Sequence, residues 1–207
     1  MKRACAISMW VGICAPAMAD VMVTQGASAP TYGVTLNFDE PGGPTGVVAP
    51  NAWSASHGIS ELQAGDGVPQ VGDFTGIFGP WVGTGNSFFG NFGVFMTWAD
   101  DLTELSTQVW DPSGPPSPFG GGFGVFVFND GVEVANYFGQ PAWGGLGDTW
   151  VDITTSGGMA FDEVRILGFG FGPTTFVDNL SWNVVPEPSA LALLALGAFA
   201  ALRRNRG

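Results

Sequence analysis

Basic residues are scarce in this chain of 207 residues: lysine and arginine together number six, against 18 aspartates and glutamates, for a formal net charge of −12. Five of the six lie in the terminal segments, at Lys2, Arg3, Arg203, Arg204 and Arg206, and Arg165 alone lies between them. A nucleic-acid-binding surface needs many cations to neutralise phosphates. We therefore expect no nucleic-acid partner, and the acidic surface is typical of a soluble domain.

Cysteine is almost absent, and both cysteines, Cys5 and Cys14, fall in the N-terminal segment. That segment has the parts of a secretory signal peptide: basic Met1-Lys2-Arg3, an apolar stretch over 4–15, and an A-x-A cleavage site at Ala17 and Ala19. We therefore expect a signal helix over 1–19 that is removed after Ala19. The mature chain then holds no cysteine, which excludes disulfides and thiol chemistry.

Catalytic motifs are also missing. His57 is the only histidine, and the chain contains no G-x-S-x-G or H-E-x-x-H sequence and no pair of histidines for zinc. A single histidine in a loop usually has a structural role, so we expect the protein not to be an enzyme. Two carboxylates from different strands remain a catalytic alternative, because glycoside hydrolysis needs only such a pair.

Glycine and aromatic residues are abundant, with 33 glycines, 15 prolines, 17 phenylalanines and 8 tryptophans. This composition favours short strands joined by turns. The predicted strands cover 32–40, 45–49, 71–78, 87–89, 93–98, 105–110, 123–128, 132–137, 150–154, 161–169 and 174–182, and Asn129-Asp130-Gly131 predicts a tight hairpin. Together they predict an all-β domain over 20–184, a two-sheet antiparallel β-sandwich of jelly-roll type, with a small barrel as the structural alternative.

The C-terminal segment, 185–207, has three physically different parts. Pro186 and Pro188 prevent a strand or helix from continuing, because each fixes φ and lacks an N–H. Residues 189–202 are uncharged and rich in alanine and leucine, which predicts a single apolar helix. At about 1.5 Å per residue this helix spans roughly 21 Å, less than the roughly 30 Å hydrocarbon core that a permanent transmembrane helix crosses. Three arginines then hold that end at the cytoplasmic membrane surface: Arg203, Arg204 and Arg206.

This tripartite end resembles the PEP-CTERM sorting signal of exported bacterial proteins associated with exopolysaccharide. Pro186, Glu187 and Pro188 fit the motif that gives the signal its name, 190–202 fits its hydrophobic span, and the arginines fit its basic end. In that family a membrane enzyme of the exosortase type recognises the signal and removes it. The resemblance implies an inner-membrane intermediate anchored by the C-terminal helix, followed by release to the cell surface or extracellular matrix.

A buried carboxylate is predicted in the last strand, because strict alternation places Asp178 on one face with Phe176, Leu180 and Trp182. Such a carboxylate needs a cation or several hydrogen-bond donors. In a jelly roll the first and last strands can lie close together, so Asp39, Glu40 and Asp178 are candidate ligands of a structural Ca²⁺, which prefers oxygen ligands. The F-x-D-N-L-x-W ending also resembles the closing strand of many PEP-CTERM proteins. Their bodies resemble lectin-like or carbohydrate-binding-module jelly rolls, several of which hold Ca²⁺ there. The alternative is that Asp178 only accepts hydrogen bonds from backbone amides.

Tryptophans form the second candidate site. Trp81, Trp110 and Trp143 lie beside Gly/Pro-rich turns, where an exposed indole ring can stack on the face of a sugar. Trp53, Trp98 and Trp150 belong to the same set of candidates. The commoner role of tryptophan is core packing.

We therefore expect an exported cell-surface or matrix protein whose β domain, without catalysis, binds or associates with extracellular polysaccharide. The alternatives are a polysaccharide-active enzyme that uses paired carboxylates, and a self-associating structural coat protein.

Overall fold

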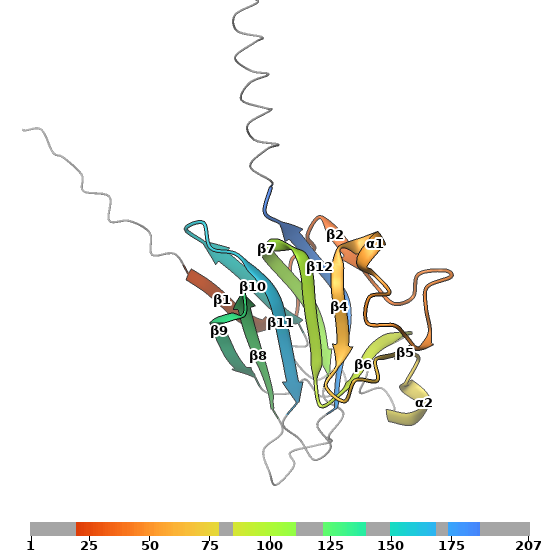
Figure 1. Cartoon of the computed structure of the whole chain (residues 1–207). Helices are drawn as coiled ribbons and strands as arrows, with labels where there is room; N and C mark the ends of the chain where they lie inside the picture. The colour runs from red at the N-terminus through yellow and green to blue at the C-terminus, as the bar shows by residue number, and fades with distance from the viewer. Residues whose placement is uncertain (1–19, 79–84, 111–121, 140–149, 169–173, 187–207) are drawn as a thin grey trace, which may run out of the picture.

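The computed structural model describes residues 20–78, 85–110, 122–139, 150–168 and 174–186, which form twelve strands and two short helices (Figure 1). The strands are β1 (Asp20–Gly26), β2 (Val34–Leu36), β3 (Gly46–Val47), β4 (Ile59–Ala64), β5 (Gln70–Gly72), β6 (Ser87–Asn91), β7 (Val94–Trp110), β8 (Phe123–Asn129), β9 (Val132–Gly139), β10 (Trp150–Ser156), β11 (Phe161–Gly168) and β12 (Thr174–Val184). The helices are α1 (Ser54–His57) and α2 (Thr75–Phe78).

The predicted signal helix over 1–19 and the predicted apolar helix over 189–202 lie outside the described residues. Within those residues, neither helix has the length and apolar character needed to cross a membrane.

The strands belong to one antiparallel hydrogen-bonded network whose longest member is β7. The first half of β7 pairs with β4 and β11, and its second half pairs with β10 and β12. The prediction of an all-β domain is thus confirmed. Because β7 takes part in both halves of the network, the prediction of two separate sheets in a jelly-roll sandwich is not confirmed.

β7 also replaces two strands that were predicted separately, over 93–98 and 105–110. Asp100 and Asp101 interrupt the apolar pattern, but their side chains are exposed and the backbone around them remains paired. The Ala99 N–H donates to the Gly58 carbonyl at 3.1 Å, and the Asp101 carbonyl accepts from the Val185 N–H at 2.7 Å. The ladder therefore continues through the acidic pair, because exposed carboxylates do not disturb backbone pairing.

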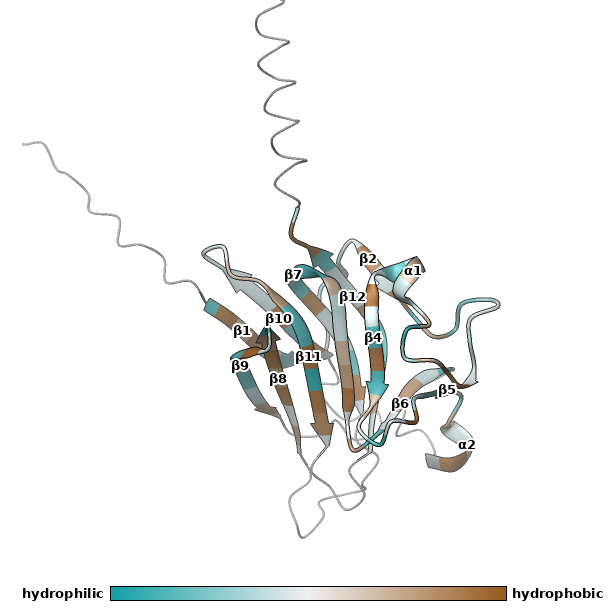
Figure 2. Cartoon of the chain, viewed as in Figure 1, coloured by the Kyte–Doolittle hydropathy of each residue, from teal (hydrophilic) through white to brown (hydrophobic). Residues whose placement is uncertain are grey.

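The core follows from alternation of side chains along the strands. On β11, Val164 and Ile166 are buried, whereas Glu163 and Arg165 face away from the core. Figure 2 shows the same alternation of hydrophobic and hydrophilic residues along β4. One cluster of buried side chains draws on both halves of the network, including Val127 of β8, Ile153 of β10 and Trp182 of β12. Full burial of such a side chain stabilises the fold by about 1.5–3 kcal/mol.

Two local predictions have different outcomes. The hairpin at Asn129-Asp130-Gly131 is confirmed, because Asp130 and Gly131 have φ values of 51° and 75° and connect β8 to β9 through the tight turn that such values permit. The predicted strand over 71–78 is wrong after β5. Asp73 accepts hydrogen bonds from the N–H and hydroxyl of Thr75, and this Asx turn leads into α2 where a strand was expected.

Candidate ligand-binding site

Polar side chains occupy neighbouring positions on β10, β7, β12 and β2, around the second half of β7. Asp152 of β10 pairs with Ser106 of β7, which pairs with Ser181 of β12, which pairs with Thr35 of β2. Ser106 and Ser181 are buried, and their hydroxyl oxygens lie 2.8 Å apart. The segment before β2 lies against them, since the Tyr32 N–H donates to Ser181 Oγ at 3.0 Å. This part of the sheet is therefore built for hydrogen bonding as well as for apolar packing.

A cavity of about 490 Å³ opens beside this row. Its lining carries hydroxyl groups, amides, one carboxylate and one indole ring: Thr31, Thr35, Ser181, Asn37, Asn179, Glu40 and Trp150, together with Leu36 and Leu180. Four of these residues, Thr31, Thr35, Asn37 and Glu40, lie on or beside β2 and are exposed. Concave sites of this size that combine a few polar groups with an aromatic ring commonly bind small organic groups.

A bulge in β12 shapes one wall of the cavity. Asn179 has a φ of 49°, and the pairing register of β12 with β7 shifts between Asp178 and Ser181. The shift turns Asn179 outward and leaves Asp178 only 4% exposed. The prediction of strict alternation through this strand is therefore wrong. Phe176 packs in a separate small cluster, whereas Leu180 belongs to the main core.

Asp178 is held by backbone and side-chain donors. Its Oδ1 accepts a hydrogen bond from the Asn179 N–H at 2.6 Å, and the backbone N–H of Phe38 also donates to the carboxylate. Burial raises the pKa of Asp178 to about 6, and the negative charge of nearby Asp39 adds to the increase, while the backbone donors oppose it. Asp39 itself accepts from the Asn86 N–H at 2.7 Å. The structure thus brings Asp39 close to Asp178, which directly precedes Asn179 of the cavity lining.

The raised pKa of Asp178 makes stability depend on pH. Its folded pKa of about 6 lies above the unfolded value of about 3.9, so its protonated form favours folding: the contribution is complete below about pH 4 and is lost as the pH rises through 6. For this nearly buried group the difference amounts to about 3 kcal/mol. We expect the unfolding free energy of Asp178→Asn, measured relative to the parent by urea denaturation, to increase by about that amount between pH 4 and pH 7. The control is Asp73→Asn, at an exposed carboxylate whose pKa is lowered by hydrogen bonds from Thr75, and it should show no such increase. Parallel pH profiles for the parent and Asp178→Asn would contradict the assignment.

The third candidate calcium ligand points elsewhere. Glu40 Oε1 lies 3.6 Å from His57 Nε2, while the carboxylate of Glu40 also lines the cavity. Among the described residues, no group of three or more histidine, cysteine, aspartate or glutamate side chains is arranged to hold a metal ion. A Ca²⁺ bound by Asp39, Glu40 and Asp178 stays a prediction, and the hydrogen bonds to Asp178 show that backbone donors take part of the role assigned to the ion.

The tryptophans predicted to stack on sugars are distributed differently. Trp110 is only 5% exposed and packs with Phe176, so its ring is not presented to a ligand. Trp81 and Trp143 lie outside the described residues. Trp150, which begins β10, is half-buried and lines the cavity. Sequence reasoning placed Trp150 among the candidates but could not select it, because its position depends on the pairing of β10 with β7.

His57 lines a smaller cavity of about 230 Å³, together with Ser56, Trp98, Trp182 and Val184 among others. The Ser56 hydroxyl and His57 Nδ1 lie 2.8 Å apart, and the imidazole ring packs 6.4 Å from the ring of Trp182. These contacts hold the ring in place, and the structural role expected of His57 stays a prediction.

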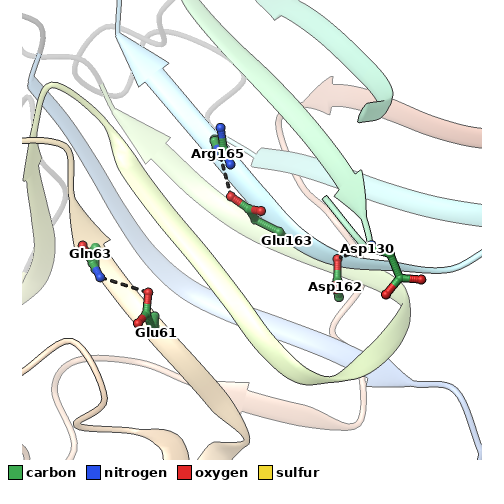
Figure 3. Close-up of polar contacts among 6 residues, drawn as sticks. All are labelled: Glu61, Gln63, Asp130, Asp162, Glu163 and Arg165. Atoms are coloured by element: carbon green, nitrogen blue, oxygen red, sulfur yellow. Dashed lines mark hydrogen bonds and ion pairs between the residues drawn. The ribbon is translucent and has the colours of Figure 1, made fainter. Parts of the chain in front are cut away.

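Arg165 is the only lysine or arginine in the described part of the chain, and it does not line the large cavity. It contacts Glu163 on β11, as Figure 3 shows, and its guanidinium carbon lies 4.3 Å from the centre of the Phe128 ring. On β4, Gln63 donates to Glu61 at 2.9 Å (Figure 3). The cavity therefore has a carboxylate in its lining and no cation among the described residues.

The C-terminal motif directly follows the fold. The last ladder bond joins Val185 to Asp101, and Pro186, which has no N–H, ends the pairing. Comparison with known families matches residues 184–206 to the PEP-CTERM protein-sorting motif. No curated protein matches the chain. The chain carries the PEP-CTERM protein-sorting motif, which implies a protein exported and sorted by an exosortase to the cell surface or the extracellular space.

Proposed function

We propose that the large cavity binds a saccharide unit of an extracellular polysaccharide, and that the domain acts by binding rather than by catalysis. The observation that carries this proposal is the composition of the cavity: hydroxyl and amide side chains around the ring of Trp150 in about 490 Å³. Sugars present hydroxyl groups at their edges and C–H groups on their faces. Amide and hydroxyl side chains can hydrogen-bond to the sugar hydroxyls, and an indole ring can pack against the C–H face.

The destination of the protein supports the same ligand class. Exosortase sorting delivers proteins to the surface or the extracellular space, where polysaccharide is the abundant polymer that such a cavity could take. The carboxylate pair that could serve glycoside hydrolysis is Asp39 and Asp178, but neither lines the cavity. A bound sugar would therefore lie against amides, hydroxyls and the carboxylate of Glu40 alone, without a second carboxylate in the lining to complete a catalytic pair, and we propose retention of the polymer without cleavage.

Filling the cavity should abolish this binding. Thr35 is an exposed strand residue in the cavity lining, so Thr35→Trp places a large ring where the sugar would lie. We expect at least a tenfold loss of affinity, equivalent to about 1.4 kcal/mol, for polysaccharide purified from the producing strain. The measurement is affinity electrophoresis with protein recovered from the cell surface or medium.

The matched control is Thr24→Trp, the same substitution at an exposed strand threonine outside the cavity. It should bind like the parent. Equal retardation of all three proteins would show that polysaccharide binds elsewhere, and an increase in reducing ends during incubation would show that the domain is an enzyme.

A further inference from the structure

The charge around the large cavity has one sign. Glu40 lines it, and its side chain is 45% exposed. Asp178 directly precedes Asn179 of the lining and is close enough to Asp39 to feel its charge, and Asp152 stands two residues from Trp150 on the same strand. Burial raises the pKa of Asp152, and Glu104 adds to that increase through its charge. Among the described residues no lysine or arginine lines the cavity, and the basic group near Glu40 is His57, whose Nε2 lies 3.6 Å from Glu40 Oε1. A concave site in which carboxylates outnumber basic groups concentrates a negative potential.

Two groups in the cavity lining, the side chains of Asn179 and Glu40, also favour a ligand that donates hydrogen bonds. The Asn179 side-chain Nδ2 donates to Gln108 Oε1 at 2.6 Å and to Asp178 Oδ2 at 3.3 Å, so Asn179 presents its carbonyl oxygen as an acceptor. The Ser181 hydroxyl is engaged by Tyr32 and Ser106. The carboxylate of Glu40 accepts hydrogen bonds only.

We propose that the saccharide unit taken by this cavity carries a free, protonated amino group, as in a de-N-acetylated amino sugar, an inference that rests on the proposed function. An ammonium group supplies three N–H donors and a positive charge, and it has no acceptor that needs a partner. An N-acetylated unit offers one neutral N–H in the same place. A uronate brings a second carboxylate next to Glu40 and is repelled by it.

The probes are tetramers of glucosamine, of N-acetylglucosamine and of an uncharged hexose, and a glucuronate-containing tetramer, each titrated calorimetrically into the full protein as recovered from the cell surface or medium. We expect the glucosamine tetramer to bind tightest at a pH below the pKa of its amine, and to bind like the uncharged hexose above that pKa. Glu40→Gln keeps the size and shape of the side chain and removes the charge. It should weaken binding of the glucosamine tetramer about fivefold, as expected for one partly exposed ion pair, and weaken binding of the N-acetylated tetramer less.

Glu61→Gln is the control, because Glu61 is an exposed carboxylate on β4 outside the cavity, where it accepts from Gln63 (Figure 3). Equal affinity for the charged and N-acetylated tetramers, or tighter binding of the glucuronate probe, would overturn the inference. If the tetramers bind in either of these ways and Thr35→Trp abolishes their binding, the proposed saccharide site stands without its preference for amines. If no tetramer binds, and purified polysaccharide does not bind either, both proposals fall.

Discussion

Replacing Pro186 and Pro188 by alanine is expected to leave the protein unprocessed in the inner membrane. In the folded domain, pairing stops after the Val185 N–H bonds to the Asp101 carbonyl, because Pro186 cannot donate. Alanine restores an N–H at both positions and is a strong helix former, so the predicted apolar helix over 189–202 can extend back towards β12. We expect the substitution to remove both the break before the predicted apolar helix and the motif that the exosortase recognises. Intact mass of the membrane and surface fractions measures the outcome.

The matched control is the double substitution Pro41→Ala and Pro44→Ala, which removes two prolines from an exposed loop. That variant should reach the surface with the same mass as the parent. Normal processing of the Pro186/Pro188 variant would show that the exosortase does not depend on these prolines.

Trp182→Ala should be the most destabilising single substitution considered for the domain. Trp182 is 1% exposed, and its ring packs edge-on against Trp98 at 5.9 Å between centroids. Truncation of a buried tryptophan costs about 3–5 kcal/mol, from a total unfolding free energy of about 5–15 kcal/mol. For a domain of this size the melting temperature should fall by roughly 10 °C, as measured by differential scanning calorimetry.

Trp150→Ala is the control for this effect, because it removes the same side chain from a half-buried position. It should reduce the melting temperature much less, while weakening polysaccharide binding through loss of the cavity's ring. Equal destabilisation by the two substitutions would mean that Trp182 contributes no more to the core than Trp150 does.

The fold class was readable from the sequence because it depends on local patterns. Alternation in segments such as 161–168 and the Asn-Asp-Gly hairpin each specify their geometry within a few residues. The architecture was not readable in the same way. Whether β7 belongs to one sheet or to both depends on which distant strands pair with its two halves. Asp100 and Asp101 suggested a break between two strands, but their side chains are exposed and the backbone around them stays paired.

The candidate site shows the same limit. The proximity of Asp39 and Asp178 could be anticipated, because it needs only that the first and last strands lie close together. The separation of Phe176 from Leu180 and Trp182 could not, since a single bulge shifts the phase of β12 after Asp178. Trp150 and Glu40 meet at the cavity through strands more than one hundred residues apart in sequence. Local pattern carries no information about that meeting.

The place of β12 in the network has a consequence for the order of events during export. β12, the last strand to be synthesised, pairs with β2, β6 and β7 and supplies Trp182 and Leu180 to the core. A chain delivered N-terminus first therefore cannot close its core until residues 174–184 have arrived. The sorting motif begins at residue 184, so we expect the core to close only as the sorting motif itself is delivered. We therefore expect export and folding to be completed together, and a chain whose export stops earlier to remain unfolded and accessible to proteases.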